Sequence, residues 1–496
     1  MNAAVVTPSP TPRWMLVLLG LALAYVLGMR VWFHVAVSPM GDEAYYWMWG
    51  QHLAWSYFDH PPLQAWLLAL VATLFGWSNV SVRLLTWLSL AGSLWILWLW
   101  AGRLAAADRL GWFLATSLAY LTIPTVALMG GIAFQDHLLL VFVLAASYAF
   151  YVFATGFEAG TPRWRWLYAA AGLLGLALLT KYNAVFLAIG FALAILFRPK
   201  LRPLFLKGHL WAALLLAAAL QTPVIWWNLT EGLASFRFHL VDRPSTAPGR
   251  LNWRGLLSFV LTTLVFMSPV LFLSLVRLPW VIRRAAPDTR RVIGLSGAVF
   301  AASSLGWAAI SLVMTVFFHW NIVAYAALAP IALLLLGRQI GLLLHVTFGL
   351  FFITAATLNY TMLPQGLFGL KDPGAPANYG WPEIAAVVTE LEASHPGAFL
   401  AATRYTYAAQ LGFQLRRSDV MAFNPLRSEN DYWWDADAHK GADALIIADR
   451  AFKIANAEAH FTAVEKLATV EALVPSAQKA WEFEIWLGHN YDGSTP

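Results

Sequence analysis

Residues 14–35 have the sequence WMLVLLGLALAYVLGMRVWFHV, and Arg30 is the only Lys or Arg among them. A helix of about 20 mostly apolar residues is long enough to cross the hydrocarbon core of a bilayer. A cleaved secretory signal has a shorter apolar core and a small-x-small cleavage site, and no such site follows this run. We therefore predict a transmembrane helix over 14–35.

Similar runs recur through the first three-quarters of the chain. Hydrophobic residues make up 60% of the 496 and charged residues 12%, whereas soluble domains are about half apolar and a quarter charged. The sequence therefore predicts a polytopic α-helical membrane protein with about eleven spans. These are 14–35, 79–100, 111–128, 138–156, 166–180, 182–198, 210–227, 254–277, 293–316, 322–338 and 340–358. The run 63–76 is too short to span, so we expect a re-entrant or interfacial helix there.

Basic residues lie mainly in every second gap between these runs. The first outer loop, 36–78, contains no Lys or Arg, and neither do 129–137 and 317–321. By the positive-inside rule, this bias places the N-terminus in the cytoplasm. The net charge of +6 then reflects membrane orientation, and we expect no nucleic-acid partner. The outer loop 228–253 is the exception, because it contains Arg237, Arg243 and Arg250.

The composition changes near residue 358, after which charged residues become frequent. Trp381-Pro382-Glu383 opens an amphipathic helix, with Pro in the first turn. The short apolar runs 398–402, 444–448 and 483–487 are typical of strands. We therefore expect a transmembrane domain over 1–359 and a small exoplasmic α/β domain over 360–496.

Several kinds of chemistry are excluded by what the sequence lacks. There is no cysteine, so disulfides, thiolate metal sites and cysteine nucleophiles are excluded. The chain has no phosphate-binding loop, no dinucleotide fingerprint and no HExxH motif. Nothing therefore indicates that the chain uses a nucleotide directly.

The first outer loop is the most informative segment. Asp42 and Glu43 precede Tyr45, Tyr46 and Trp47. One interpretation is an interfacial helix with an aromatic belt and solvated acids. The other places carboxylates at the mouth of a membrane cavity, where an acid orients or deprotonates an acceptor hydroxyl. The residues alone leave both interpretations open.

Further ionisable residues fall at other predicted outer junctions. Asp136, between Gln135 and His137, lies where the chain re-enters the membrane, so it is either a helix N-cap or a functional acid. Lys181 lies at a helix junction, where it either snorkels to the interface or binds a phosphate. His319 begins another outer turn, where an interfacial role is the simpler interpretation.

The basic outer loop adds Arg237, His239 and Arg243. An arginine fork binds two phosphate oxygens at once, although plain surface solvation also explains these side chains. All five groups of candidates fall on the same predicted side of the membrane. Acids and cations sharing one outer cavity suit an acceptor hydroxyl and a lipid-linked phosphate.

The quoted motifs resemble a known family. GDEAYYW (41–47), YFDHPPLQAWL (57–67), QDHLLL (135–140), LLTKYNAVFL (178–187) and WWNLTEGLASFRFHLVDR (226–243) are similar to motifs of the bacterial PMT_2-type glycosyltransferases. These belong to the GT-C superfamily, with the protein O-mannosyltransferases and the aminoarabinose transferase of lipid A. The resemblance covers most of 14–360 and extends weakly into the tail.

The resemblance implies a transferase in the bacterial inner membrane whose active site faces the periplasm. Its donor is expected to be a polyprenyl-phosphate-linked sugar, and its acceptor a cell-envelope lipid or glycan, with lipid A or lipopolysaccharide favoured. Ser/Thr O-mannosylation of protein is the alternative within the family. A lipid-linked substrate transporter or flippase is the alternative from another class.

The resemblance also assigns roles to single residues. Asp42, with Glu43 beside it, matches the acid of the first loop, and Asp136 matches that of the second, although Gln135 stands where the family often has Thr or Pro. His60 replaces a Lys that contacts the lipid phosphate in the aminoarabinose transferase. The expected donor-phosphate ligands are therefore His60, Lys181, Arg237 and Arg243. The expected substrate contacts are Tyr45, Tyr46, His137 and His319.

Cofactor use is the least constrained feature. Family members differ in their dependence on metal, and Asp42, Glu43 and Asp136 would bind a divalent ion only if they converge. We therefore assign no metal ligands and no cofactor, and leave a divalent metal open. For the chemistry, we predict a single displacement that inverts the anomeric carbon, with Asp42 as the base.

Overall fold

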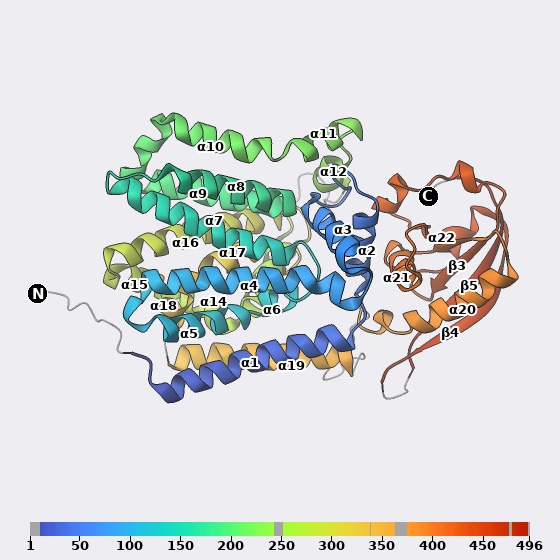
Figure 1. Cartoon of the computed structure of the whole chain (residues 1–496), viewed down its shortest axis with the longest axis horizontal. Helices are drawn as coiled ribbons and strands as arrows, with labels where there is room; N and C mark the ends of the chain where they lie inside the picture. Colours follow the sequence, from blue (N-terminus) through green and yellow to red (C-terminus); the bar gives the residue numbers. More distant parts are fainter. Residues whose placement is uncertain (1–9, 243–250, 338, 363–373, 476–478, 495–496) are drawn as a thin grey trace, which may run out of the picture. The chain divides into compact units, whose positions relative to one another are not determined.

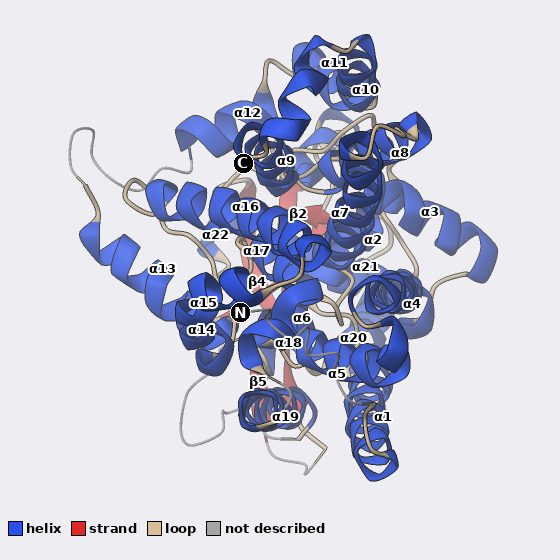
Figure 2. Ribbon diagram, turned by 90° about the vertical axis from the view of Figure 1, so that its left-hand side faces the viewer, coloured by secondary structure: helices blue, strands red, loops and turns tan. Residues whose placement is uncertain are grey.

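The computed structural model describes residues 10–242, 251–337, 339–362, 374–475 and 479–494. Within these ranges the chain is mostly helical, and every strand follows residue 398 (Figure 2). The predicted helical membrane protein with a small α/β tail is confirmed at this level.

The helices before the tail begin close to where the apolar runs begin. In chain order they are α1 (Arg13–Ala36), α2 (Gly41–Gln51), α3 (Leu63–Phe75), α4 (Asn79–Leu104), α5 (Arg109–Leu121), α6 (Pro124–Met129), α7 (Asp136–Glu158), α8 (Trp164–Thr180), α9 (Val185–Phe197), α10 (Gly208–Ala219), α11 (Thr222–Thr230), α12 (Ala234–Arg237), α13 (Trp253–Phe266), α14 (Pro269–Ser274), α15 (Leu278–Arg284), α16 (Pro287–Ile310), α17 (Ile322–Leu328), α18 (Ala332–Leu336) and α19 (Ile340–Thr361). A single 3-10 turn, η2 (Tyr182–Ala184), lies between α8 and α9, and a short π-helix, η4 (Phe238–Asp242), follows α12. Helices α7, α8 and α9 pack side by side (Figure 1).

Several predicted spans are broken helices. Among the described residues, five helices are long and apolar enough to cross a membrane, or up to eight if each bent pair counts as one span. The predicted span 254–277 bends by 103° where Pro269 opens α14, and 111–128 is divided between α5 and α6 at Pro124. Proline lacks the N–H that would continue the helix and is tolerated in a first turn. The predicted count of eleven is therefore not confirmed.

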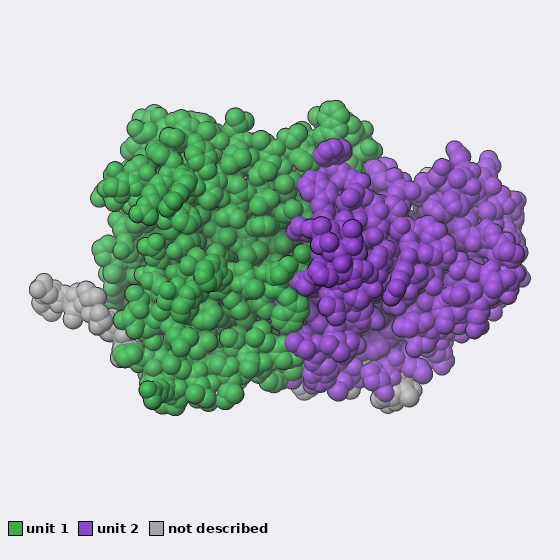
Figure 3. Space-filling model, in the orientation of Figure 1, with its two compact units in different colours: residues 1–29, 60–63, 85–353 green, residues 30–59, 64–84, 354–496 purple. Residues whose placement is uncertain are grey.

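The described chain separates into two compact units (Figure 3). Unit 1 comprises Met1–Met29, His60–Leu63 and Leu85–Ile353, and unit 2 comprises Arg30–Asp59, Gln64–Leu84 and Thr354–Pro496. Unit 2 thus combines the first outer loop with the C-terminal tail. A transmembrane domain over 1–359 followed by an α/β domain over 360–496 remains our proposal for the order of the domains along the chain.

The tail of unit 2 is built around a five-stranded mixed sheet of order β2-β1-β3-β5-β4. Strand β1 runs parallel to β2 and β3, whereas β5 is antiparallel to both β3 and β4. The strands are β1 (Phe399–Ala402), β2 (Met421–Ala422), β3 (Ala444–Asp449), β4 (Phe461–Leu473) and β5 (Lys479–Tyr491). The three strands predicted from sequence correspond to β1, β3 and β5.

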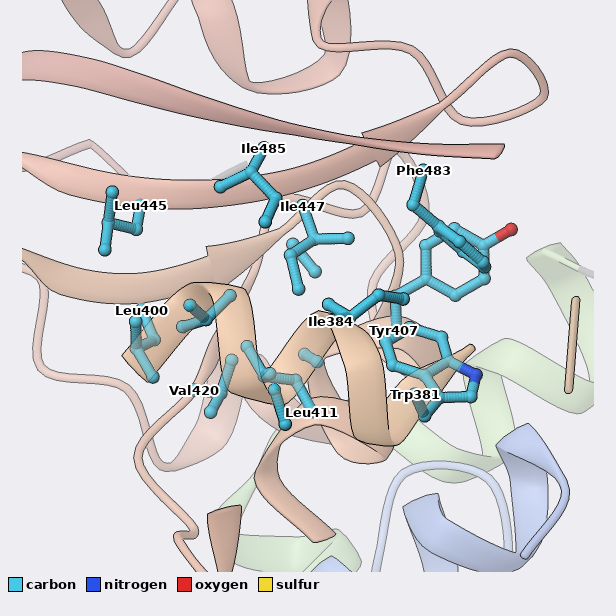
Figure 4. Close-up of a cluster of buried hydrophobic side chains, with 14 of the residues drawn as sticks. Trp381, Ile384, Leu400, Tyr407, Leu411, Val420, Leu445, Ile447, Phe483 and Ile485 are labelled. Carbon is cyan, nitrogen blue, oxygen red and sulfur yellow. The ribbon is translucent and has the colours of Figure 1, made fainter. Parts of the chain in front are cut away.

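Helices α20 (Trp381–Ser394), α21 (Tyr405–Leu415) and α22 (Ala455–Glu458) accompany this sheet. The predicted amphipathic helix at Trp381 is α20, and its apolar face is buried. Figure 4 shows Ile384 and Leu411 from the helices facing Leu445, Ile447 and Ile485 from the strands. Each Å² of apolar surface removed from water stabilises the fold by about 25 cal/mol. This shared apolar core therefore holds α21 against the sheet.

Candidate active site

In unit 2, the start of α2 is fixed by a buried ion pair. Glu43 is fully buried, and its two carboxylate oxygens accept hydrogen bonds from Arg83 Nε and Nη2 at 2.9 and 2.6 Å. One of these oxygens also accepts from the backbone N–H of Met40, at 2.9 Å, which caps the helix. Glu43 is thus engaged in holding α2, which favours a structural role over the expected catalytic one.

Arg83 completes this arrangement from the first turns of α4. Its Nη1 donates to the carbonyls of His34 and Val37 at 3.2 and 2.7 Å, and its Nη2 donates to Ser38 at 3.2 Å. The three nitrogens of this buried guanidinium all donate hydrogen bonds, and these bonds link the end of α1 to the starts of α2 and α4. Sequence reasoning missed Arg83, although a charged residue inside an apolar helix was a visible indication of a partner.

Asp42, next to this pair, has a different environment. It is only partly buried, and its Oδ1 accepts a hydrogen bond from the Tyr405 hydroxyl at 3.1 Å. Burial raises the pKa of Asp42 above its ordinary value, and the hydrogen bond from Tyr405 and the positive charge of Arg404 oppose that rise. A carboxylate with a raised pKa is better suited to accept a proton than an ordinary surface aspartate.

The aromatic residues that follow Asp42 are packed inside unit 2. Tyr45 is 1% exposed, and its hydroxyl accepts a hydrogen bond from the backbone N–H of Glu429 at 2.7 Å. Tyr46 is 7% exposed and packs edge-on against Trp49. These rings have little surface left for a sugar, so we assign them to packing instead of the expected substrate contact.

In unit 1, the second predicted acid lies in another buried ion pair. Lys181 Nζ donates to both carboxylate oxygens of Asp136, at 2.7 and 2.9 Å. Asp136 is fully buried at the start of α7, and Lys181 is 4% exposed between α8 and η2. The N-cap of α7 is Gln135, so the interpretation of Asp136 as the cap residue is wrong by one position. Its partnership with Lys181 was not predicted.

His137, the next residue in α7, is 1% exposed, and its Nδ1 lies 2.8 Å from the Ser89 hydroxyl. This contact crosses to α4 within unit 1. The ring is therefore part of the helix packing, which does not favour the expected role in contacting substrate.

A cavity of about 650 Å³ opens beside Lys181 in unit 1. Its lining is mainly apolar, and its polar members come from helix ends and the turns between them. The lining residues are His60, Leu178, Lys181, Tyr182, Asn183, Val185, Phe186, Gln221, Val224, Ile225, Phe236, His239, Trp307, Ile310, Val313, Met314 and Trp320. The rings of His60 and His239 have centroids 6.5 Å apart. The cavity thus unites two of the predicted phosphate ligands, His60 and Lys181, with His239.

The other predicted ligands lie elsewhere or outside the described residues. Arg237 is exposed at the end of α12 and does not line the cavity. Arg243 falls outside the described residues. His319 is partly buried with its ring stacked on Phe317, while its neighbour Trp320 lines the cavity. The Trp320 carbonyl accepts from the Asn183 side chain at 2.8 Å, a contact that sequence reasoning missed.

The candidates therefore form two sets. Asp42 and Glu43 belong to unit 2 with Arg83 and Tyr405, and Asp136, Lys181 and His60 belong to unit 1 with the cavity. Their convergence on one pocket remains a prediction. Within the described residues, no group of three or more His, Asp or Glu side chains is arranged to hold a metal ion.

Comparisons with known proteins point in one direction. The family described as dolichyl-phosphate-mannose-protein mannosyltransferase, PMT_2, matches residues 59–227. The lipid A galacturonosyltransferase RgtD of Rhizobium johnstonii is 28% identical over 360 residues, which cover 69% of this chain and 73% of that protein.

Solved structures agree with the fold. The crystal structure of ArnT from Cupriavidus metallidurans bound to undecaprenyl phosphate matches with a TM-score of 0.65 at 15% identity, covering 96% of this chain and 99% of ArnT. The apo state of the same protein matches with a TM-score of 0.62, again at 15% identity, covering 94% of this chain and 98% of that one. At this identity the likeness concerns the fold alone.

Proposed function

We propose that this chain is a multi-pass membrane glycosyltransferase of the PMT_2 type with a GT-C fold, and that it transfers a sugar from a polyprenyl-phosphate carrier to lipid A. We place this reaction at the periplasmic face of the bacterial inner membrane, in line with the charge bias of the predicted loops. Lipid A is the acceptor named for the galacturonosyltransferase relative, and undecaprenyl phosphate is the lipid bound to ArnT in its crystal structure.

One observation carries the proposal: an apolar cavity in unit 1 has a buried ammonium group in its wall. Most of its lining consists of side chains such as Val224, Ile310 and Met314, which suit an isoprenoid chain. Lys181 lines the same cavity, and its positive charge suits a phosphate. A ligand with an apolar tail and an anionic head satisfies both features.

Lys181 retains capacity for such a ligand. An ammonium group has three donors, and two of them go to Asp136. Among the described residues the third has no hydrogen-bond partner. Asp136 therefore orients the ammonium group, and the remaining donor is available to a phosphate oxygen in the cavity.

The reaction follows from the donor chemistry. The bond between the anomeric carbon and the phosphate oxygen breaks, and its electron pair leaves with the polyprenyl phosphate. An acceptor oxygen attacks from the opposite face and inverts the anomeric centre. Lys181 stabilises the charge that develops on the leaving phosphate. If the acceptor is a hydroxyl, Asp42 takes its proton; if it is a phosphate of lipid A, Asp42 positions that group without taking a proton.

The identity of the transferred sugar is the most specific part of the proposal. The name of the relative with 28% identity specifies galacturonic acid, so we favour a uronic acid over a neutral hexose or an aminopentose.

The test uses the full chain in liposomes that contain lipid A. Undecaprenyl-phosphate-linked galacturonic acid, a neutral hexose and aminoarabinose are supplied in turn, and mass spectrometry follows the mass of lipid A. We expect a gain of one uronic acid, dependent on the polyprenyl phosphate. Transfer of a different sugar would correct the donor, and modification of protein but not lipid A would overturn the acceptor.

A complementary experiment compares lipid A from cells with and without this chain. Loss of one glycosyl substituent in the deletion strain, restored by the wild-type gene, is the expected result. Unchanged lipid A with an altered protein glycan would favour the protein-modifying alternative.

A further inference from the structure

The starts of α2 and α21 approach each other unusually closely within unit 2. A Cβ atom placed on Gly41, directly before Asp42, would lie 2.8 Å from Cβ of Thr406. That distance is shorter than side-chain contacts normally allow, so the closeness depends on glycine at 41. The α/β tail therefore reaches Asp42 with its own helix, and the contact joins residues far apart in the chain.

The Tyr405 ring is held in place on more than one side. It packs against the Tyr45 ring at a centroid distance of 4.5 Å. Tyr45 is in turn fixed by the backbone N–H of Glu429, and a carboxylate oxygen of Glu429 accepts from the Phe58 N–H at 2.5 Å. A hydroxyl on such a locked ring is a preorganised donor.

This donor engages one oxygen of Asp42 and leaves the other available. Oδ1 accepts from Tyr405 at 3.1 Å, while among the described residues Oδ2 accepts no hydrogen bond. A base anchored through one oxygen presents the other in a defined direction to the proton that it removes.

The charges around Asp42 come from three elements of unit 2. Tyr405 approaches from the first turn of α21 and Arg404 from its N-cap, Glu43 approaches from α2, and Glu43 is itself neutralised by Arg83 of α4. The acid Asp59 also acts on Tyr405 and, together with Asp42, raises the pKa of its phenol. Tyr405 thus keeps its proton and acts on Asp42 as a donor.

We propose that Tyr405 is a positioning residue for Asp42, so that the C-terminal α/β fold supplies part of the catalytic apparatus and is more than an outer attachment. The inference rests on the proposed function for the role of Asp42 as a base. It names a residue in the tail, outside the loops from which the catalytic acids were predicted.

The test compares Tyr405→Phe with Tyr407→Phe in the full-length protein. Tyr407 lies on the same helix, is buried where Tyr405 is partly buried, and donates to a carboxylate, Asp449, at 2.7 Å. Each variant therefore removes one hydroxyl bonded to an acid, but only Tyr405→Phe removes one from Asp42. Thermal unfolding of both variants monitors the structural cost common to them.

The first readout is the pH dependence of sugar transfer. The Tyr405 hydrogen bond lowers the pKa of Asp42, so its loss raises that pKa and moves the acidic limb of the profile to higher pH. We expect a shift of about one pH unit, with about tenfold slower transfer on that limb. Tyr407→Phe should leave the limb in place. Equal profiles for the two variants would overturn the claim that sugar transfer depends on this hydrogen bond to Asp42.

The second readout does not use transfer. Water-soluble carbodiimide labels protonated carboxyl groups, and mass spectrometry of the peptide containing Asp42 gives its labelling midpoint. Tyr405→Phe should raise this midpoint relative to both wild type and Tyr407→Phe. Arg404→Gln, which keeps Tyr405, should raise it by less.

The two readouts separate the two hypotheses. A wild-type protein that transfers no sugar from a polyprenyl phosphate refutes the proposed function, while the labelling midpoints still decide whether Tyr405 controls Asp42. An unmoved midpoint in Tyr405→Phe refutes the positioning role, whatever the transfer assay shows.

Discussion

Two buried ion pairs, one in each compact unit, differ in how completely their hydrogen-bonding capacity is used. Arg83 in unit 2 donates to both oxygens of Glu43 and to three backbone carbonyls. Lys181 in unit 1 donates to Asp136 from the wall of a cavity and has a donor to spare. We call the Arg83–Glu43 pair closed, because the N–H donors of Arg83 are used within the protein. We call the Lys181–Asp136 pair open, because one donor of Lys181 is left for a ligand.

The difference shows that burial of a charge is not enough to identify a functional residue. A closed pair fixes backbone segments, since removal of either partner leaves an uncompensated charge. An open pair holds a charge ready for a ligand. The acids at 42 and 43 illustrate the same distinction within two residues, because Glu43 is enclosed while Asp42 keeps one oxygen available.

The largest expected effect comes from Asp42→Asn. The amide keeps an oxygen that accepts from Tyr405 but cannot take a proton, so we expect transfer to a hydroxyl acceptor to fall by about 10²–10⁴-fold. Thermal unfolding should stay close to wild type. The measurement is the initial rate of sugar transfer in liposomes. Near wild-type transfer would remove Asp42 from the role of base.

Glu43→Gln tests the closed pair. It leaves Arg83 buried without its anionic partner, and we expect a loss of about 3–5 kcal/mol in the free energy of unfolding. Denaturant unfolding in detergent measures this loss. The double variant Glu43→Leu/Arg83→Met should recover part of it, because it removes both charges. A fully stable Glu43→Gln protein without transfer would instead indicate a chemical role for Glu43.

Lys181→Gln tests the open pair. It removes the ammonium group from the cavity, so we expect KM for the polyprenyl-phosphate sugar to rise by about 10–100-fold. The loss of stability should be smaller than for Glu43→Gln, because the N-terminal amides of α7 stabilise Asp136. Arg165→Gln, on the exposed side of α8, is the matched control. An unchanged donor KM would argue against Lys181 as a phosphate ligand.

The smallest expected effect concerns Asp431, an acid of unit 2 without an ion pair among the described residues. Burial raises its pKa from 3.8 to about 6. The stability that comes from its protonation is therefore fully present below about pH 3.8 and is lost as pH rises through 6. After allowance for solvent screening, we expect about 1 kcal/mol or less.

Asp431→Asn should flatten the dependence of unfolding temperature on pH between 4 and 6, while wild type becomes more stable as pH falls through that window. Identical slopes for the two proteins would show that Asp431 does not titrate in this way.

Local features were predictable from the sequence. The apolar length of 14–35, the Pro-Glu pair that opens α20 and the short apolar runs of β1, β3 and β5 each act within a few residues. Helix breaks were harder to predict, because an apolar run looks continuous across Pro124 or Pro269 although the backbone turns there.

The candidate site was predictable in its residue types but not in its pairings. Asp42, Asp136 and Lys181 stood out as ionisable residues beside apolar runs. The partners Arg83 and Tyr405 depend on packing between segments separated in sequence by 40 and 363 residues. No periodic pattern encodes such contacts, so the sequence did not show which side chains Arg83 and Asp42 would contact.

The distance along the chain between Asp42 and Tyr405 has a consequence for biosynthesis. At about 5–20 residues per second, a ribosome needs roughly 20–70 s to make the intervening 363 residues. During that delay the nascent chain already contains Glu43 and Arg83, whereas α21 does not yet exist. The Glu43–Arg83 pair can therefore keep the start of α2 ordered until α21 has been synthesised. Chains truncated before α21 should accordingly insert into the membrane without acquiring activity.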